Sequence, residues 1–484
     1  MTKDKSFIHL FETPGGFYLY DVNRNSILKV EKSVYDSLKS GIESISNNNI
    51  SYKDSLKNII KNMREKGFLS EKRIKEVSHP ATDKLDYFLS NKIRMIILQV
   101  TQQCNLRCEY CAYSGKYMNR GHANNRMSFE TAKKGIDFLI ANSRDVDSIN
   151  IAFYGGEPLL EFKLMKKCIE YAKTAAEGKT IRFNFTTNGT LFTREIIDYL
   201  SFHDVSITIS LDGPREVQDK SRKFASNGCG TFEKINENLE IIKNNYPEYF
   251  SKILFNIVLD KENDFSCVND FFASYDTIKD SMLNASEKSM HYAKSEINSS
   301  EEFDIKMRYE TFKLFLSKIN KLDSKHVSKL VENNYNAIKK IALSEREQTN
   351  ELPDTAHHSG PCIPGTQRLF MDVNGNLYPC EKCSESSDTV NIGHIDKGFD
   401  IEKVRKLLNI GKITSENCIN CWAFRFCYIC AVAVDDTKGI SPENKRSMCG
   451  VVRRVQEQCF KDYCTLKEFG YEFDEKSRNF LMEG

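Results

Sequence analysis

The sequence predicts a mixed α/β fold built in three parts. Short strand patterns followed by helix patterns occupy residues 1–75. Between residues 95 and 275, apolar strand patterns alternate with amphipathic helix patterns, which predicts parallel strands joined by helical crossovers. Residues 361–450 are rich in cysteine. We therefore expect a central parallel sheet, with a smaller domain before it and another after it in the chain.

The first part predicts a small sheet accompanied by helices. Its expected strands cover Ile8–Phe11, Phe17–Asp21 and Ser26–Val30, and its expected helices cover Ser33–Leu38 and Tyr52–Lys66. Strands followed by helices in so short a segment are typical of a winged helix-turn-helix-like domain. The segment contains no group of residues suited to catalysis.

The central part contains five strand–helix units. The expected strands are Met95–Val100, Ser148–Tyr154, Thr180–Phe185, Val205–Leu211 and Ile253–Leu259, with a sixth at Ser281–Asn284. The expected helices are Ser128–Ala141, Leu159–Ala175, Thr193–Phe202, Phe232–Asn244 and Phe265–Tyr275. Such units form a parallel sheet with right-handed crossovers, and side chains at the carboxyl ends of its strands collect at one edge.

The chain is organised around the motif Cys104-Asn-Leu-Arg-Cys108-Glu-Tyr-Cys111, which follows the first central strand. Three thiolates can hold three irons of a [4Fe–4S] cluster and leave the fourth iron open to a small ligand. A protein that only transfers electrons needs all four irons covered, so three cysteines indicate chemistry at the cluster. The alternative is a zinc knuckle that lacks one ligand.

The cysteine motif resembles the signature of the radical S-adenosylmethionine (SAM) enzymes. In that family SAM binds the open iron, and one electron from the cluster cleaves it to methionine and a 5′-deoxyadenosyl radical that abstracts hydrogen from unactivated carbon. The resemblance implies that residues 91–290 form a partial (β/α)6 TIM-like barrel, with its chemistry at the carboxyl ends of the strands.

Segments at the next strand ends resemble the SAM-binding loops of the family. Gly155-Gly156-Glu157-Pro158 follows the second strand; its glycines allow the backbone to approach a ligand, and Glu157 supplies a carboxylate. Alone, Asn188-Gly189 and Asp212-Gly213-Pro214 are ordinary turn sequences. The resemblance implies that SAM is bound by Gly155, Gly156, Glu157, Asn188, Ser210 and Arg222.

The C-terminal cysteines form a second pattern, which consists of Cys362, Cys380, the run Cys418-x2-Cys421-x5-Cys427-x2-Cys430, and Cys449. This pattern resembles the SPASM domain, which carries two auxiliary [4Fe–4S] clusters. The run departs from the family in having only Tyr428 and Ile429 before its fourth cysteine, where three residues are usual. Pairs of C-x2-C also form zinc ribbons, which is the alternative.

The SPASM resemblance implies a ligand set for each auxiliary cluster. The distal cluster would take Cys418, Cys421, Cys427 and Cys449, and the proximal cluster would take Cys362, Cys380 and Cys430. Cys383 is a candidate fourth ligand of the proximal cluster, because a C-x2-C pair can reach one cluster. If Cys383 is free, the open proximal iron could bind a substrate thiolate.

Glu381 is a candidate catalytic residue, because it directly follows Cys380. A similarly placed acid serves as a base in sulfatase-maturing relatives. A surface glutamate is the alternative.

The remaining segments predict connecting structure. Residues 291–360 are expected to form a helical bridging region, with helices at Phe303–Ile319 and Val327–Ala342. Met371–Tyr378 predicts a hairpin with an Asn-Gly turn. Residues 451–484 are expected to form a C-terminal helix and tail.

Composition excludes some classes of protein. The net charge is +2 with both signs mixed, so no electrostatic footprint for nucleic acid or an anionic membrane is present. The sequence contains neither a signal-peptide pattern nor the roughly 20 apolar residues of a membrane span. We therefore expect a cytoplasmic protein, and sixteen cysteines in a reducing compartment indicate Fe–S or metal ligation over disulfides.

As a whole, the chain resembles the radical SAM/SPASM peptide maturases of the ranthipeptide and sactipeptide type. Residues 1–75 resemble their leader-peptide recognition domain, in which a peptide can add as an extra strand; a capping domain is the alternative. The resemblance implies three [4Fe–4S] clusters, SAM, and an electron donor such as flavodoxin or ferredoxin. It also implies a precursor peptide, with a leader and a cysteine-containing core, that receives a thioether.

Other functions remain open. Within the enzymes, the alternatives are a sulfatase-type protein maturase, a peptide epimerase and an enzyme that forms carbon–carbon crosslinks. The non-enzyme alternative is an Fe–S or zinc scaffold that binds a peptide.

Overall fold

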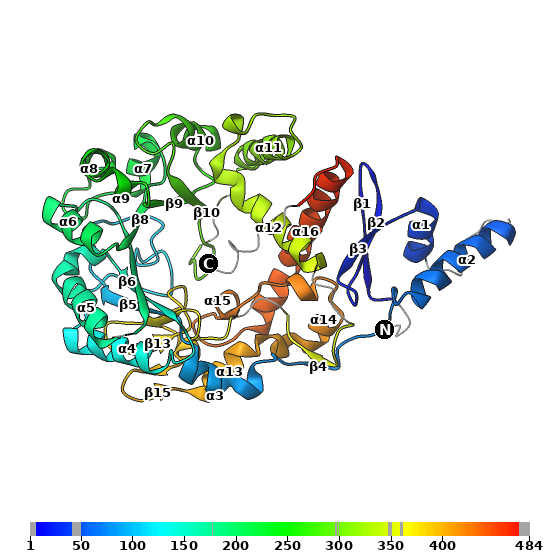
Figure 1. Ribbon diagram of the computed structural model, residues 1–484, viewed down its shortest axis with the longest axis horizontal. Coiled ribbons are helices and arrows are strands. Elements are labelled where there is room, and N and C mark those ends of the chain that lie inside the picture. The colour runs from blue at the N-terminus through cyan, green and yellow to red at the C-terminus, as the bar shows by residue number, and fades with distance from the viewer. Residues whose placement is uncertain are drawn as a thin grey trace.

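The computed structural model describes residues 6–40, 50–176, 178–295, 298, 300–346, 351–358 and 362–473. A curved sheet with helices along its outer side forms one half of the molecule, and a small sheet with a protruding helix lies at the opposite end (Figure 1). The end of the predicted C-terminal tail, residues 474–484, lies outside the described residues.

The curved sheet contains six parallel strands. They are β5 (Met95–Thr101), β6 (Ser148–Gly155), β7 (Thr180–Thr187), β8 (Ser206–Ser210), β9 (Leu254–Leu259) and β10 (Met282–Glu287). The strands lie side by side in chain order, and each neighbouring pair is parallel. The carboxyl ends of all six strands therefore face the same side of the molecule.

Helices connect these strands and cover the outer face of the sheet. They are α4 (Phe129–Ala141), α5 (Phe162–Ala175), α6 (Arg194–Phe202), α7 (Arg215–Ser221), α8 (Phe232–Asn245), α9 (Pro247–Phe250) and α10 (Phe265–Ser274). Ser128 and Thr193 cap α4 and α6 by accepting backbone N–H groups. Phe153 and Phe185 are almost completely buried between sheet and helices. The predicted α/β class and partial barrel are confirmed.

The sheet continues beyond β5 into the cysteine-rich part. The added strands are β12 (Leu369–Met371), β13 (Asn376–Tyr378), β14 (Gly393–His394) and β15 (Gly398–Phe399). Strand β12 pairs in parallel with β5, and β12 and β13 form the predicted antiparallel hairpin. Gly375 occupies its turn with φ +90°, a conformation that favours glycine. The barrel and the cysteine-rich part thus share one sheet.

The N-terminal part has the predicted strands followed by helices. Its elements are β1 (Ile8–Thr13), β2 (Gly16–Asp21), β3 (Ser26–Val30), α1 (Lys32–Ser40) and α2 (Ile50–Glu65). The strands form an antiparallel sheet in the order β1-β2-β3, so β3 lies at an edge. Leu19, Val34 and Leu56 belong to a separate small core that joins this sheet to the helices.

The remaining elements connect the ends of the molecule. They are β4 (Glu76–Val77), α3 (Leu85–Asn91), α11 (Glu301–Lys318), α12 (Glu332–Arg346), β11 (Thr355–Ala356), α13 (Ile401–Leu408), α14 (Ser415–Ile419), α15 (Ala431–Val434) and α16 (Pro442–Glu468). Helix α16 begins earlier than predicted, because Ser441 caps it and Pro442 occupies its first turn. It therefore carries Cys449.

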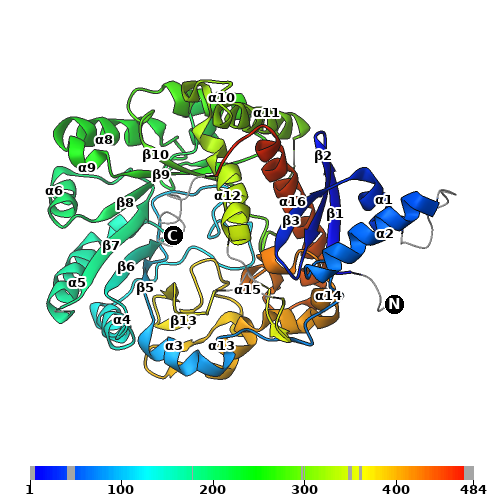
Figure 2. The same ribbon diagram turned by 45° about the vertical axis from the view of Figure 1, so that its right-hand side comes forward.

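Helix α16 runs alongside β1 (Figures 1 and 2). Phe460 of this helix is fully buried, and its ring lies 4.8 Å from that of Tyr20 and 5.7 Å from that of Phe11. Aromatic packing thus fixes the N-terminal sheet to the C-terminal helix.

None of the helices in the described ranges combines the length and the apolar character that crossing a membrane would need.

Candidate functional site

Cys104, Cys108 and Cys111 lie together in the loop after β5. Burial raises the pKa of the Cys104 thiol to about 12 and that of the Cys108 thiol to about 11, and the neighbouring thiols add to both shifts. A metal that binds these thiols must therefore displace protons.

The sulfur atoms of this loop accept hydrogen bonds from the backbone. The N–H group of Leu106 donates to Cys104 Sγ over 3.3 Å, and that of Tyr113 donates to Cys111 Sγ over 3.4 Å. Hydrogen bonds of this kind stabilise metal-bound thiolates and tune Fe–S clusters. The loop is therefore suited to hold thiolates and, through them, an Fe–S cluster.

The loop that follows β6 is joined to the cysteine loop through its backbone. The Gly156 N–H donates to Thr101 O over 2.9 Å, and the Glu157 N–H donates to Gln103 O over 3.0 Å. A Cβ atom at Gly155 would lie 2.0 Å from Thr101 O, and one at Gly156 would lie 2.1 Å from Gln103 O. Both glycines are thus required for this close approach.

Glu157 is buried, and its carboxylate is held by the protein. It accepts hydrogen bonds from Thr187 Oγ1 over 2.7 Å, from Asn188 N over 2.8 Å and from Leu159 N over 3.1 Å. Burial raises the pKa of Glu157 to about 7. Glu157 therefore ties the end of β6 to the end of β7.

Asn188 joins the end of β7 to the cysteine loop. Its Nδ2 donates to Asn105 Oδ1 over 2.8 Å and lies 3.9 Å from Cys104 Sγ. Ser210 is buried at the carboxyl end of β8. The structure therefore brings both predicted residues to the same edge of the sheet.

Arg222 is buried beside Cys108. Its Nε donates to Asp212 Oδ2 over 2.9 Å, and its guanidinium lies 5.4 Å from the centre of the Tyr110 ring. The Tyr110 hydroxyl donates to the same carboxylate oxygen of Asp212. Asp212 also accepts from Val258 N over 3.0 Å. Asp212 thus positions Arg222, a role that its turn sequence did not indicate.

The cysteines predicted for the proximal cluster also lie together. Cys380 and Cys383 form a thiol–thiol hydrogen bond, which lowers the pKa of Cys380 and raises that of Cys383. Cys362 lies at the surface, close enough to Cys380 and Cys430 for their charges to act on it. The structure therefore places Cys383 with the three expected ligands.

A second group contains the cysteines predicted for the distal cluster. Cys421 lies close enough to Cys418 and Cys449 for electrostatic interaction with both. Cys427 lies similarly close to Cys418 and Cys421. Cys449 reaches this group from α16. Within the described ranges, no three His, Cys, Asp or Glu side chains converge closely enough to hold a single metal ion.

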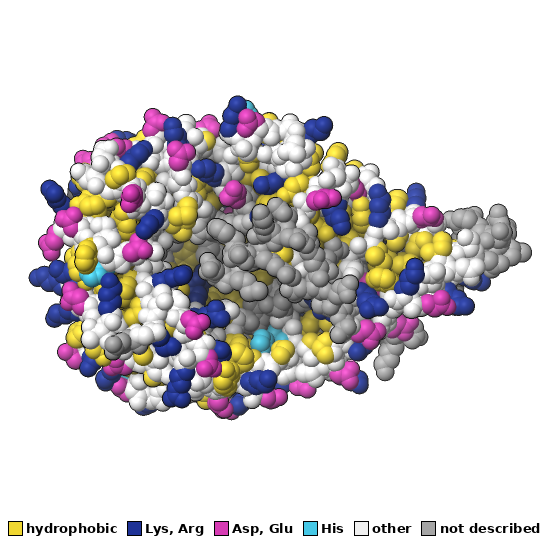
Figure 3. Space-filling view, in the orientation of Figure 1, with side chains coloured by type: hydrophobic (Ala, Val, Ile, Leu, Met, Phe, Trp, Pro, Cys, Tyr) yellow, Lys and Arg dark blue, Asp and Glu magenta, His cyan; other side chains and the backbone are white. Residues whose placement is uncertain are grey.

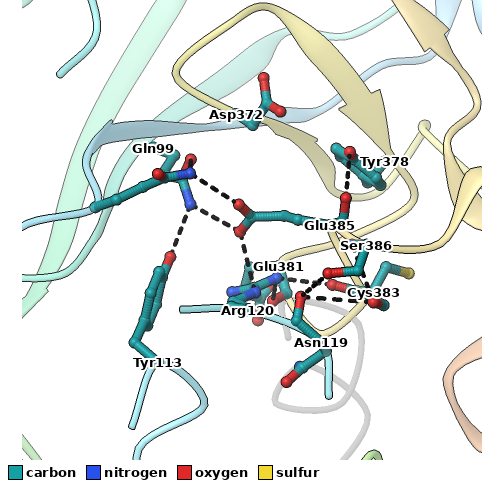
Figure 4. Close-up of polar contacts among 12 residues, drawn as sticks. Gln99, Tyr113, Asn119, Arg120, Asp372, Tyr378, Glu381, Cys383, Glu385 and Ser386 are labelled. Atoms are coloured by element: carbon teal, nitrogen blue, oxygen red, sulfur yellow. Dashed lines mark hydrogen bonds and ion pairs between the residues drawn. The ribbon is translucent and has the colours of Figure 1, made fainter. Parts of the chain in front are cut away.

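A buried polar network links the cysteine loop after β5 to the Cys380–Cys383 loop (Figure 4). Arg120 Nε lies 3.0 Å from Glu385 Oε1, and its Nη2 donates to the carbonyl oxygens of Glu381 and Cys383 over 2.6 and 2.8 Å. Gln99 donates to Glu385 Oε1 over 2.7 Å. Sequence reasoning missed this network, because its partners are far apart in the chain and belong to no motif.

Glu381, the candidate catalytic residue, is largely buried. Its Oε1 accepts from Arg368 Nη2 over 2.5 Å, and its Oε2 is buried without a hydrogen-bond partner. Its side chain is only 12% exposed. Glu381 is thus mostly shielded from solvent and paired with Arg368, and its catalytic role stays a prediction.

Replacing Gly156 with alanine should disrupt the site. The added Cβ would meet the backbone of Gln103 and Cys104, which cannot rotate away, and such overpacking costs about 1–3 kcal/mol. We expect a lower melting temperature and less iron bound at the Cys104 loop, measured by calorimetry and metal analysis. Gly121→Ala is the matched control, because nothing lies within 4 Å of its added Cβ. Equal stability and iron content in the two variants would contradict this assignment.

Comparison with known proteins identifies the central part. Residues 98–271 match the family model of the radical SAM superfamily. The chain is 32% identical over 183 residues to a serine-type anaerobic sulfatase-maturating enzyme of Bacteroides thetaiotaomicron, which covers 37% of this chain and 41% of that enzyme. It is 26% identical over 270 residues to a radical SAM cyclopropyl synthase of Paramaledivibacter caminithermalis. That aligned region covers 51% of this chain and 54% of the synthase.

A solved structure shares the fold. It is titled native anSMEcpe with bound AdoMet and Cp18Cys peptide, and it matches 78% of this chain and 98% of its own chain with a TM-score of 0.56 and 19% identity. The chain spans about half the length of the curated relatives it matches.

Proposed function

We propose that this chain, a member of the radical SAM superfamily through its domain at residues 98–271, is an enzyme that modifies a peptide by radical chemistry. The observation that carries the proposal is the junction of the cysteine loop with the Gly155–Glu157 loop at the carboxyl ends of the strands. A scaffold that only transfers electrons has no use for that second loop.

The residues of this edge fit the expected cofactors. Cys104, Cys108 and Cys111 would hold a [4Fe–4S] cluster, because they are grouped and their sulfurs accept N–H groups. SAM would be held by Gly155, Gly156, Asn188, Ser210 and Arg222, with Glu157 fixing the loop around it. When bound, the cluster and SAM together supply one-electron chemistry that removes a hydrogen atom from unactivated carbon.

Arg222 provides positive charge beside Cys108, where a carboxylate of SAM would gain from it. Asp212 and Tyr110 hold the guanidinium in place from both sides. The charge is therefore positioned before any ligand binds, so little ordering is needed on binding.

We propose that the peptide is recruited by residues 1–75. A groove of about 1220 Å³ lies between the edge strand β3 and helix α2, and its apolar lining includes Leu28, Val30, Val34, Ile59, Met63 and Phe68. Hydrophobic side chains gather over this protruding end of the molecule (Figure 3). An extended leader could add to β3 and place alternate side chains in the groove.

Introducing a charge into this groove should weaken peptide binding. Ile59→Glu removes an apolar contact worth about 1.5–3 kcal/mol, which corresponds to a loss of about tenfold to hundredfold in affinity. The measurement is fluorescence anisotropy with a labelled leader from a cysteine-containing precursor peptide. Ile241→Glu is the control, because Ile241 is an exposed isoleucine on α8, outside the groove. The proposal is wrong if both variants bind the leader as tightly as the unaltered chain.

We propose further that the reaction forms a thioether crosslink in the core of that peptide. Joining a carbon to a cysteine sulfur removes one C–H and one S–H bond, which is a loss of two electrons and two protons. One electron and one proton leave with the abstracted hydrogen atom, so a second electron and proton must leave separately. The two further cysteine groups would supply auxiliary [4Fe–4S] clusters as a route for that electron, towards a carrier such as flavodoxin or ferredoxin.

Anaerobic metal analysis tests the cofactor proposal. We expect about 12 irons with matching sulfide for three four-iron clusters. Cys104→Ala combined with Cys108→Ala should lose about four irons and stop the release of 5′-deoxyadenosine from SAM, measured by chromatography. Cys229→Ala is the control, because Cys229 is exposed and lies in none of the three predicted ligand sets. Continued 5′-deoxyadenosine release by the double variant, or zinc in place of iron, would refute the proposal.

A sulfatase-type protein maturase is the second candidate. It is favoured by the similarity to sulfatase-maturating enzymes and by the buried, partly unsatisfied carboxylate of Glu381 beside Cys380. In such an enzyme Glu381 would act as a general base that removes a proton from the oxidised residue.

Glu381→Gln tests this candidate. General bases contribute about 10²–10⁴-fold to a rate, so oxidation of a cysteine or serine peptide should fall by at least about a hundredfold. The measurement is mass spectrometry of the peptide product. Glu402→Gln serves as the control, because Glu402 is an exposed glutamate on α13. Undiminished turnover would remove Glu381 from the reaction.

A further inference from the structure

Lys445 is one of the most deeply buried large side chains in the described structure. It lies in α16 and is 1% exposed. Its Nζ donates to Cys418 Sγ over 3.1 Å and to Thr414 Oγ1 over 2.6 Å. The thiol of Cys449, one turn later on the same face of the helix, donates to the Lys445 carbonyl oxygen over 3.3 Å. The lysine thus lies inside the group of cysteines predicted for the distal cluster.

This buried amino group has no carboxylate partner within the described part of the chain. Among the ion pairs of the described residues, none joins Lys445 to an aspartate or glutamate, and its two side-chain partners are a thiol and a hydroxyl. Burying an unpaired charge is costly, so buried lysines are normally paired. A negative charge is therefore expected nearby that does not come from a carboxylate of the described chain.

The two neighbouring histidines do not supply the negative charge expected near Lys445. His357 and His358 lie near Lys445, and a histidine side chain carries no negative charge that could balance the lysine. The charge of Lys445 also acts on Cys427. Thiolates of Cys418, Cys421, Cys427 and Cys449 that hold an iron cluster would supply the missing negative charge.

We propose that Lys445 is a positioning residue that raises the reduction potential of the distal [4Fe–4S] cluster by donating a charge-assisted hydrogen bond to Cys418 Sγ. Adding an electron makes a thiolate-held cluster more negative, and a fixed positive charge beside a ligand sulfur stabilises the reduced form more than the oxidised form. The inference rests on the proposed function, because it requires that these four cysteines hold the distal cluster.

The cysteines predicted for the proximal cluster lack such a contact with a cation in the described structure. Among the hydrogen bonds of the described residues, none joins a lysine or arginine side chain to the sulfur of Cys380, Cys383 or Cys430. Arg120 approaches this group but donates to backbone carbonyls and pairs with Glu385. The charges of Arg368 and Lys382 also act on the proximal cysteines, but neither side chain donates to their sulfurs among the described hydrogen bonds. Lys445 would therefore raise the potential of the distal cluster by a direct contact, which favours electron transfer towards that cluster and away from the barrel.

A potentiometric titration followed by electron paramagnetic resonance tests this inference on the full chain loaded anaerobically with iron and sulfide. The distal signal is identified as the one lost in a Cys421→Ala, Cys427→Ala variant. In Lys445→Met, the ratio of reduced to oxidised distal cluster at a fixed applied potential should fall at least tenfold. This corresponds to a reduction potential lower by about 59 mV for a one-electron couple. Lys445→Gln, which keeps a donor without the charge, should give a smaller fall. Arg446→Met removes a neighbouring exposed charge and should leave the ratio unchanged.

The outcomes separate this inference from the function on which it rests. An unloaded distal site in the unaltered chain would remove the three-cluster proposal and this inference together. A loaded distal cluster with the same potential in Lys445→Met, Lys445→Gln and the unaltered chain would overturn the inference alone. Loss of about four irons from both Lys445 variants would assign the lysine to cluster assembly and would likewise overturn its role in setting the potential.

Discussion

The parallel pairing of β12 with β5 is the interaction on which the rest of the site depends. It joins Leu369 to Ile96 and so builds the cysteine-rich part directly onto the barrel sheet. Strand β5 leads into the Cys104 loop and the β12–β13 hairpin leads into the Cys380 loop, so this pairing fixes both cysteine loops to one sheet. The buried contact between Arg120 and Glu385 then closes the space between these loops.

The N-terminal domain that carries the proposed peptide groove is joined to the distal cysteines by similarly direct contacts. The His9 ring in β1 stacks on Trp422, which follows Cys421, with ring centres 3.7 Å apart and planes 7° from parallel. Arg425 donates to the carbonyl oxygens of Val22 and Asn23 over 2.7 and 3.1 Å. The N-terminal sheet thus packs against the loop that would hold the distal cluster, and a peptide bound at β3 would add to that same sheet.

The sequence predicted features that depend on one continuous segment, but it did not predict contacts between segments far apart in the chain. Strand and helix patterns depend on periodicity within a segment, so the central strands and the three-strand N-terminal sheet could be predicted closely. The cysteine loop and Gly155–Glu157 could be located because their chemistry requires particular residues next to one another in the chain. The Arg120–Glu385 pair and the Lys445–Cys418 contact join segments far apart in sequence. In the sequence alone, Arg120, Glu385 and Lys445 each resemble a solvated charge. Helix α16 was predicted too short, because its capping signal at Ser441 precedes an unusually polar first turn.

The buried cations of the described residues, Arg120, Arg222 and Lys445, each lie beside one of the three cysteine groups but differ in their partners. Arg222 lies beside the Cys108 loop and Arg120 beside the Cys383 loop, and each is paired with a carboxylate of the chain, Asp212 or Glu385. The carboxylate offsets part of the positive charge, although the guanidinium still attracts negative groups that contact it directly. Lys445 has no carboxylate partner among the described ion pairs and donates to the sulfur of Cys418 instead. The three cysteine groups therefore differ in what their buried cation contacts, which is a carboxylate beside Cys108 and Cys383 and a cysteine sulfur at Cys418.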